Sequence, residues 1–370
     1  MYRIFILGAG FSRPSGLPLG NELFSEVWKL AEIREYSQGQ LGNDLKRYSR
    51  FVAKTTGCQP KIENINLEDF ISFLDVEHIL HLKGSDQWSD EGNKSQLILR
   101  NLIALALKLK QDSAAPDQLR LYDDFVKNLT KMDFIATFNY DTLLEEAMER
   151  NGISYRLVPG RFEEVDEDGG TFSDEDDDET VILKLHGSID WFDISHYERQ
   201  RSSRHPVFGV EREYKYSPLI REPYPVKRPL YKLQRLHSMS EYLAADEFIW
   251  EAPIIISPST HKLAYINRFS ELWREISNVG YYANSVGIIG FSIAPHDIYL
   301  KQVIYDIVNK FQNVKGERRG IKTKLKMIDY RKTREQISDY KSIYSFVNWN
   351  DTESYFDGFN DRSLEGLFSV

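Results

Sequence analysis

The sequence contains a single cysteine, Cys58, among 370 residues. One cysteine can form no disulfide within the chain and cannot supply a zinc site built from several cysteines. The histidines are scattered without the spacing of metal ligands, so we expect no bound metal. Long apolar runs are also lacking, because no stretch approaches the roughly 20 apolar residues that a membrane span needs, and the apolar start MYRIFILGAG is too short for a signal peptide. We therefore expect a soluble, cytoplasmic protein with no membrane contact.

The chain also lacks an excess of positive charge. The chain has 47 Lys and Arg against 56 Asp and Glu, which gives a formal net charge of −9 and a pI near 5.5. A protein whose main partner is a phosphate backbone needs clustered positive charge, so we expect no direct nucleic-acid binding. Hydrophobic residues make up 41% of the chain and aromatic residues 13%. This content is enough for a well-buried core in one large domain, or in a core with insertions.

Short apolar runs recur along the chain, bounded by glycine or polar residues. They begin at Tyr2, Asp133, Val181, Ala252, Ser285 and Lys324. Continuous apolar runs of this length are typical of strands that are covered on both faces, as in a parallel sheet. Between some of them the apolar residues follow a helical period, for example over residues 298–311. The pattern predicts an α/β fold, a Rossmann-like parallel sheet with helices on both faces.

Several segments interrupt or extend this predicted core of residues 1–330. Residues from about 21 to 130 have helical patterning and predict a helical insertion, and a second insertion is predicted from about 193 to 250. Residues 163–179 are strongly acidic and form either a solvated loop or a docking surface for a basic partner. The tail, residues 331–370, is rich in aromatic residues, which suit packing on the core or an assembly contact with another chain.

Polar or glycine-rich motifs follow five of the predicted strands. They are GAGFS at 8–12, Asn139 with Asp141, His186, GFS at 290–292 and Asp329. Ligands of parallel α/β sheets bind beyond the carboxyl ends of the strands, so we expect these motifs to converge on one crevice. Structural alternatives exist: a plain turn for the two glycines, a hydrogen-bonded core histidine, and a capping-box-like helix start from Asp141 or Thr142 with Glu145.

The motifs GAGFS, TFNYD, LHG and GFS resemble, in order and context, the NAD site of the sirtuin fold. Their spelling is most similar to the sirtuin-like NADases of bacterial anti-phage defence. The resemblance covers most of residues 1–330 and implies NAD as the substrate. Two departures from deacylase sirtuins disfavour protein deacylation: one cysteine cannot supply their four-cysteine zinc ribbon, and the segment RPSGLPLGNEL at 13–23 lacks their Asp-Phe-Arg. Cleavage of the nicotinamide–ribose bond is unaffected by both departures.

Site roles follow from the resemblance together with the chemistry of that bond. His186 is the expected base, which accepts a proton from a water or a ribose hydroxyl, and Asn139 positions that group without adding charge. Asp141 either orders the ribose or caps its helix. The remaining residues expected to bind the dinucleotide are Gly8, Ala9, Gly10, Phe11, Ser12, Gly290, Ser292 and Asp329.

The predicted function is NAD+ hydrolysis to nicotinamide and ADP-ribose, as a gated effector of anti-phage defence by NAD depletion. Two alternatives stay open at this point: NAD-dependent transfer, either ADP-ribosylation or deacylation, and sensing of NAD or ADP-ribose without turnover. The resemblance also implies partners. We expect a homo-oligomer that pairs with a HerA-type ring ATPase or another defence partner protein.

Overall fold

The computed structural model describes residues 2–82, 92–157, 162–165, 171–173, 179–193, 233–235, 252–256, 258–262, 272–273, 276, 279–280, 282–294, 297–313 and 322–369. The chain divides into two compact units. The first unit comprises Met1–Gly20, Lys110–His186 and Ile266–Val370, and the second comprises Asn21–Leu109 and Gly187–Tyr265. Most of the predicted second insertion and of the acidic loop lies outside the described residues.

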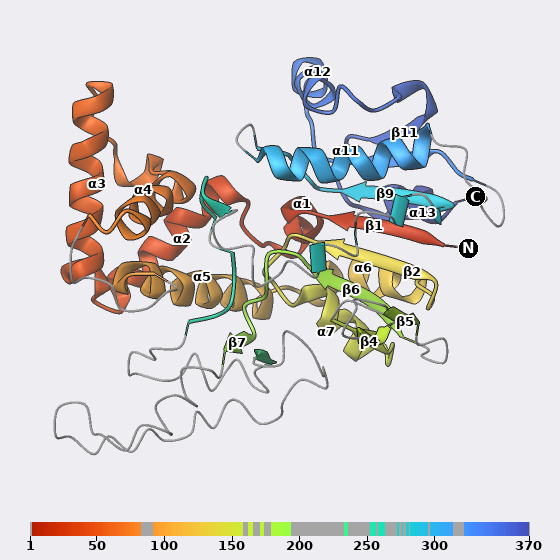
Figure 1. The fold of residues 1–370 in the computed structure, drawn as a ribbon, viewed down its shortest axis with the longest axis horizontal. Coiled ribbons are helices and arrows are strands. Elements are labelled where there is room, and N and C mark those ends of the chain that lie inside the picture. The colour runs from red at the N-terminus through yellow and green to blue at the C-terminus, as the bar shows by residue number, and fades with distance from the viewer. Residues whose placement is uncertain are drawn as a thin grey trace. The chain divides into compact units, whose positions relative to one another are not determined.

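A seven-stranded parallel sheet forms the centre of the first unit (Figure 1). Its strands are β1 (Arg3–Leu7), β2 (Asp133–Thr137), β3 (Tyr155–Arg156), β6 (Thr180–Lys184), β9 (Ser285–Ile289), β10 (Leu325–Ile328) and β11 (Thr352–Tyr355). They lie in the order β11-β10-β9-β1-β2-β6-β3, and every pairing is parallel. The predicted parallel α/β sheet is confirmed. After β6 the chain returns to the other side of β1, so the strand order reverses between β1 and β9.

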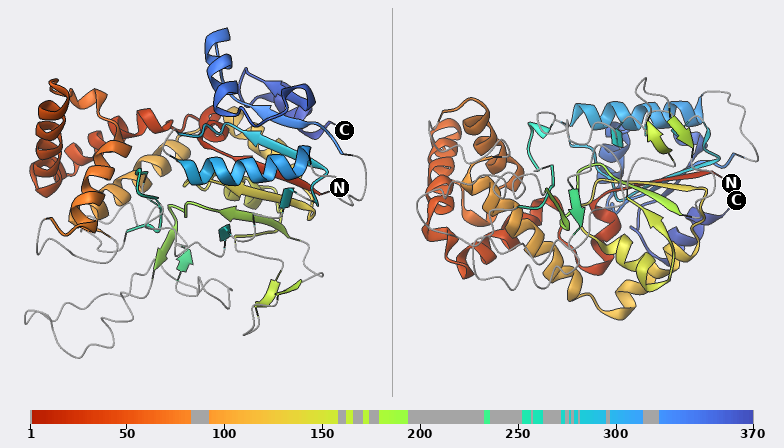
Figure 2. Two further views of the ribbon diagram at one scale, coloured as in Figure 1. Left: turned by 45° about the horizontal axis from the view of Figure 1, so that its top comes forward. Right: turned by 60° about the horizontal axis from the view of Figure 1, so that its bottom comes forward.

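Helices cover both faces of this sheet, which explains why its strands are continuous apolar runs. The ring of Phe5 in β1 contacts Phe125 of α6 (Pro116–Lys127) at 5.4 Å and Phe368 of α13 (Asp361–Phe368) at 5.5 Å between ring centroids. α11 (Ile298–Gln312) lies on the opposite side of the strands (Figure 2). Phe5 and its neighbours Ile4 and Ile6 are accordingly 0% exposed.

The strand predictions at the edges of the sheet were less accurate. The run from Ala252 is not a strand of this sheet, and in the described residues Ile255 makes only an isolated antiparallel bridge to Gly187. Pro253 and Pro258 bound that run, and a proline has no N–H to donate to a ladder. The edge strands β3 and β11 were not predicted. β3 has two residues and β11 has the polar sequence TESY, so neither carries an apolar run.

The tail after Asp329 contributes to the first unit. It forms α12 (Arg334–Ile343), the edge strand β11 and α13. Lys326 of β10 is 2% exposed, and its Nζ donates to the carbonyl oxygens of Gly366 at 2.6 Å and Leu367 at 3.2 Å. Carbonyl groups at a helix C-terminus have no partner within the helix, so this ammonium group satisfies the end of α13. Burial lowers the pKa of Lys326 from its usual range.

The remaining elements are short or belong to the second unit. α2 (Gly20–Ile33), α3 (Gln40–Thr56), α4 (Leu67–Ile79) and α5 (Lys94–Asp112) form the helical insertion between β1 and β2, as the sequence predicts. The other elements are α1 (Ala9–Ser12), α7 (Leu143–Arg150), β4 (Phe162–Val165), β5 (Thr171–Ser173), β7 (Trp191–Asp193) and β8 (Leu233–Arg235). β4 pairs with β5, and β7 pairs with β8, both antiparallel. Among the described helices, none has the length and apolar character to cross a bilayer.

Candidate functional site

The turn after β1 packs directly against the turn after β9. Gly8 N–H donates to Ile289 O at 2.9 Å, and Gly10 N–H donates to Gly290 O at 2.8 Å. A Cβ atom on Gly10 would lie 2.6 Å from Gly290 Cα, so the two backbones approach too closely for any side chain there. The N–H groups of Gly8 and Gly10 are therefore satisfied within the protein, and a phosphate at this turn would have to use other donors.

Gly290 is the most constrained of these glycines. Its φ is +58°, and a Cβ there would lie 2.3 Å from Gly10 C. Gly152 has a similar φ of +65° but has nothing within 4 Å of its Cβ position. Gly290→Ala and Gly152→Ala should both cost the strain of a left-handed conformation, about 1–2 kcal/mol. Only Gly290→Ala adds the overlap, so denaturant unfolding should find it less stable by a further 1–3 kcal/mol or so. Equal losses in the two variants would disprove this account.

Asn139 joins the β1 turn to the end of β2 through its side-chain amide. Its Nδ2 donates to Gly8 O at 2.9 Å and to Ser12 Oγ at 3.1 Å, and Ser12 Oγ donates to Asp141 Oδ2 at 2.9 Å. A carbonyl oxygen can only accept, so the group facing Gly8 O has to be the NH2 of the amide. Both hydrogens of that NH2 are thus used within the protein. The amide oxygen Oδ1 is left as the acceptor that a ligand hydroxyl or a water can use.

Asp141 lies in a buried charge cluster behind this network. Its Oδ1 accepts from Leu143 N at 3.2 Å, at the start of α7. Lys184 Nζ donates to Asp141 O and to Glu145 Oε1, each at 2.6 Å, and the Lys184 and Glu145 side chains are 0% and 2% exposed. The predicted capping box is wrong, because Thr142, the N-cap of α7, makes no side-chain cap hydrogen bond, and the Glu145 carboxylate pairs with Lys184. Burial raises the pKa of Asp141, and the nearby Lys184 opposes the shift.

The raised pKa of Asp141 has a consequence for stability. Between its ordinary pKa of 3.8 and its raised folded-state pKa, the folded chain binds more protons than the unfolded chain, so stability falls as pH rises through that window. Asparagine keeps the shape and does not titrate. Asp141→Asn should therefore be more stable than the wild type at pH 7, by roughly 0.5–2 kcal/mol, and the gain should shrink as pH falls from the raised pKa toward 3.8 and be lost below it. Thermal melts across this pH range test the trend, which a less stable variant at pH 7 would refute.

His186 lies at the end of β6, level with Asn139. Thr137 of β2 pairs with Lys184 of β6. Asn139 comes two residues after Thr137, and His186 comes two residues after Lys184. His186 is 5% exposed, and its Nε2 lies 3.1 Å from Tyr299 Oη. We did not predict Tyr299. It lies in the first turn of α11, after the GFS motif.

Aromatic rings surround His186 on several sides. Their centroids lie 5.1 Å away for Phe138, 6.2 Å for Tyr140 and 6.3 Å for Trp273. Trp273 also contacts Tyr299, with ring centroids 5.5 Å apart. The indole Nε1 of Trp273 is buried and has no hydrogen-bond partner in the described part of the chain. Aromatic rings thus line the imidazole, and the phenol of Tyr299 is one of its polar contacts.

Ser292 and Asp329 form a separate cluster at the ends of β9 and β10. Asp329 Oδ1 accepts from Tyr330 N at 2.7 Å, and Asp329 Oδ2 accepts from Arg331 Nη2 at 2.9 Å. The same Nη2 donates to Ser292 Oγ at 2.6 Å. Burial raises the pKa of Asp329, and the guanidinium of Arg331 opposes the shift. Arg331 was not predicted as a site residue, although it follows the last predicted strand at the same edge of the sheet.

The predicted site residues follow the carboxyl ends of the strands, and all of them except Ala9 and Phe11 fall into three groups. The first group is the network of Gly8, Gly10, Ser12, Asn139 and Asp141, with Gly290 packed against its turn. The second is His186 with its aromatic neighbours, and the third is Ser292 with Asp329. Ala9 is exposed. Phe11 is 1% exposed and its ring packs on Tyr122 and Phe359, so its side chain belongs to the core.

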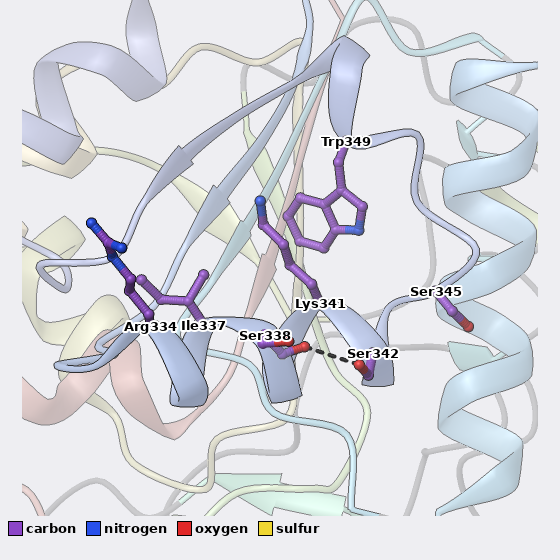
Figure 3. A pocket seen from close by; sticks show the side chains of 7 residues that line it. All are labelled: Arg334, Ile337, Ser338, Lys341, Ser342, Ser345 and Trp349. Carbon is purple, nitrogen blue, oxygen red and sulfur yellow. Dashed lines mark hydrogen bonds between the residues drawn. The ribbon is translucent and has the colours of Figure 1, made fainter.

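A pocket of about 500 Å³ lies over α12 (Figure 3). Its lining residues are Arg334, Ile337, Ser338, Lys341, Ser342, Ser345 and Trp349. The ammonium of Lys341 lies 5.0 Å from the centre of the Trp349 ring, and Ser342 Oγ donates to Ser338 O at 3.0 Å. None of the predicted site residues lines this pocket. Within the described residues, no three His, Cys, Asp or Glu side chains are grouped as metal ligands.

Comparisons with known proteins point to one family for part of the chain. Residues 133–234 match the family model described as SIR2-like domain. A solved structure from work on sirtuin substrate affinity is 12% identical, covers 100% of this chain and 94% of its own, and has a TM-score of 0.36. The structure of Sir2Tm bound to a propionylated peptide is 11% identical over 99% of this chain and 90% of its own, with a TM-score of 0.32. No curated protein sequence matches the chain.

Proposed function

We propose that the chain hydrolyses NAD+ at the nicotinamide–ribose bond, giving nicotinamide and ADP-ribose. The observation that carries this proposal is the pairing of His186 and Asn139 at matched positions beyond adjacent parallel strands, beside the glycine turn of β1. That edge, next to the reversal of strand order, is where open α/β sheets bind nucleotides. The match of residues 133–234 to a SIR2-like domain supports an NAD-related activity in general.

The chemistry of this bond suits the two side chains. Nicotinamide is attached as a cation and leaves as a neutral molecule with the bonding electron pair, so no general acid is needed for its departure. The ribose becomes oxocarbenium-like at C1′, as in glycoside hydrolysis. A water then forms the new C1′–O bond and loses one proton. His186 accepts that proton as general base, a role that typically contributes about 10²–10⁴-fold to the rate.

Asn139 holds the attacking water or the ribose hydroxyls. Because both of its amide hydrogens are donated to Gly8 O and Ser12 Oγ, its Oδ1 accepts a hydrogen bond from the ligand side. An amide positions these groups without a full charge that would compete for the ribose cation. Ser12 and Asp141 fix the amide from behind, which makes them positioning residues in this proposal.

A single assay tests the proposed function. The pure chain is incubated with NAD+, and free nicotinamide and ADP-ribose are followed with time. Hydrolysis predicts that both products appear in equal amounts. ADP-ribose attached to protein would instead indicate transfer, and tight binding without nicotinamide release would indicate sensing; either result overturns hydrolysis.

We further propose that this activity is gated and serves anti-phage defence by NAD depletion. An NAD+ hydrolase that is always active would exhaust the NAD of its own cell, so its rate has to depend on a second binding event. A homo-oligomer paired with a HerA-type ring ATPase or another defence protein would supply that event. Measuring the mass in solution and the nicotinamide release rate, with and without the partner, tests this. A monomer with an undiminished rate that no partner alters would rule it out.

A further inference from the structure

Arg331 is held rigidly at the end of β10. Its Nη2 donates both to Ser292 Oγ and to Asp329 Oδ2. Its guanidinium carbon lies 4.9 Å from the centre of the Tyr340 ring, a cation–π geometry. Tyr340 itself is 1% exposed and part of the core. A long side chain normally loses much conformational freedom when it binds a ligand, and these three contacts have already restricted Arg331.

The guanidinium also has donors to spare. An arginine carries five N–H hydrogens and no acceptor, and the two hydrogen bonds above are both made by Nη2. Nε is buried without a partner, and no hydrogen bond is made by Nη1 within the described part of the chain. The side chain is 25% exposed, so a ligand can reach it.

Asp329 cannot be the main ligand contact at this position. Its side chain is only 10% exposed. One of its oxygens accepts from Tyr330 N, and the other accepts from Arg331 and lies 3.4 Å from Ser292 Oγ. A carboxylate that selects an unmodified ribose has to accept from the free 2′-hydroxyl. Here the carboxylate is occupied by the protein, and the group that faces outward is a guanidinium, which prefers phosphate.

The sheet topology places this guanidinium against one half of a dinucleotide. Strand order reverses between β1 and β9, and a dinucleotide lies across such a reversal with one half on each side. The proposed cleavage site, with His186 and Asn139, is on the β2–β6 side. The other half, the adenosine, therefore falls on the β9–β10 side, where Arg331 and Ser292 lie.

We propose that Arg331 binds a phosphate on the adenosine ribose, so that the site accepts dinucleotides phosphorylated at the 2′ position, the NADP class, in addition to NAD. This inference rests on the proposed function for the orientation of the dinucleotide. It assigns Arg331 as a specificity-determining residue, with Asp329, Ser292 and Tyr340 as the groups that hold it in place.

Binding of two product-like ligands tests the inference without requiring turnover. Calorimetry measures the Kd of ADP-ribose and of 2′-phospho-ADP-ribose for the full chain and its variants. The wild type should bind the phosphorylated ligand at least as tightly as ADP-ribose. Arg331→Ala should weaken the phosphorylated ligand about 10–100-fold, the usual effect of losing hydrogen bonds to a charged group, and should weaken ADP-ribose by less than about 3-fold. Arg331→Lys keeps the positive charge but lacks the planar guanidinium. Its Kd for the phosphorylated ligand should lie between those of the wild type and Arg331→Ala.

Lys332→Ala is the matched control, because it removes one positive charge at the next position, where the side chain is exposed. It should leave both Kd values unchanged within about 2-fold, since an exposed charge is screened by solvent. Melting curves identify any variant that fails to fold, and Arg331→Lys, which can still pair with Asp329, then carries the test.

The outcomes separate this inference from the proposed function. Equal loss of both ligands in Arg331→Ala, or wild-type binding of the phosphorylated ligand more than about 10-fold weaker than ADP-ribose, overturns the inference while nicotinamide release still stands. Arg331-dependent binding of the phosphorylated ligand without nicotinamide release supports the inference and overturns hydrolysis. Failure of both ligands to bind overturns the inference. Hydrolysis is then tested separately, by nicotinamide release from NAD+.

Discussion

Replacing His186 with alanine should lower the rate of nicotinamide release from NAD+ by about 10²–10⁴-fold, the usual contribution of a general base. The variant should still fold, because His186 lies beyond the end of β6 and not within the strand. The hydrogen bond between its Nε2 and Tyr299 Oη is worth about 0.5–1.5 kcal/mol of stability. Steady-state nicotinamide release and a thermal melt, measured on the same preparation, give the two quantities.

An exposed histidine provides the matched control for this substitution. His81→Ala removes the same side chain from the second unit, where His81 is exposed, and should leave the rate unchanged. Asn139→Ala is the companion variant, and it should also strongly reduce nicotinamide release, because it removes the acceptor Oδ1. If His186→Ala keeps near-wild-type turnover with a normal melting temperature, the base has been assigned to the wrong residue.

The largest expected loss of stability comes from Lys184→Met. Lys184 and Glu145 form an ion pair with side chains 0% and 2% exposed, and Asp141 lies beside it. Methionine would leave the carboxylate of Glu145 buried without its cation, a change that typically costs about 3–5 kcal/mol. The backbone oxygen of Asp141 would also lose a donor. Denaturant unfolding at pH 7 measures the loss.

Removing both charges together separates the unpaired charge from the packing. Lys184→Met combined with Glu145→Leu leaves no unpaired charge at this pair and should recover most of the loss, although Asp141 still lacks its neighbouring cation. The exposed lysine Lys29, which pairs with Glu26, serves as the comparison. Lys29→Met should change stability by less than about 0.5 kcal/mol. A double variant no more stable than Lys184→Met alone would show that the loss has another origin.

The sequence predicted the centre of the sheet better than its edges. Central strands such as β1 are buried on both faces, so their residues have to be continuously apolar, and such runs are visible in a sequence. An edge strand such as β11 is half-buried, and its TESY carries no such run. The run from Ala252 was equally apolar. An apolar run indicates that a segment is buried, but it does not show which element the segment pairs with. For that reason it was mistaken for a strand of the same sheet.

The same limit applies to the site. Glycines, Asn139 and His186 could be located because each follows a recognisable strand. Their partners could not be inferred, since a hydrogen bond between Asn139 and Ser12 joins residues 127 positions apart. The pairing of Lys184 with Glu145 likewise depends on how α7 packs beside β6, which no local pattern encodes. Arg331 was overlooked because one arginine after a strand has no distinctive context.

The position of β1 in the sheet has a consequence for synthesis on the ribosome. β1 is made long before either of its two neighbours in the sheet: Arg3 pairs with Asp133 on one side and with Ser285 on the other. At about 5–20 residues per second, roughly 15–55 s pass between synthesis of β1 and of β9. Both edges of β1 are open until β2 has been made, and the edge that pairs with β9 stays open for the whole interval, a state prone to aggregation. Productive folding therefore requires that this edge be shielded, by a chaperone or by the chain itself, until translation reaches β9.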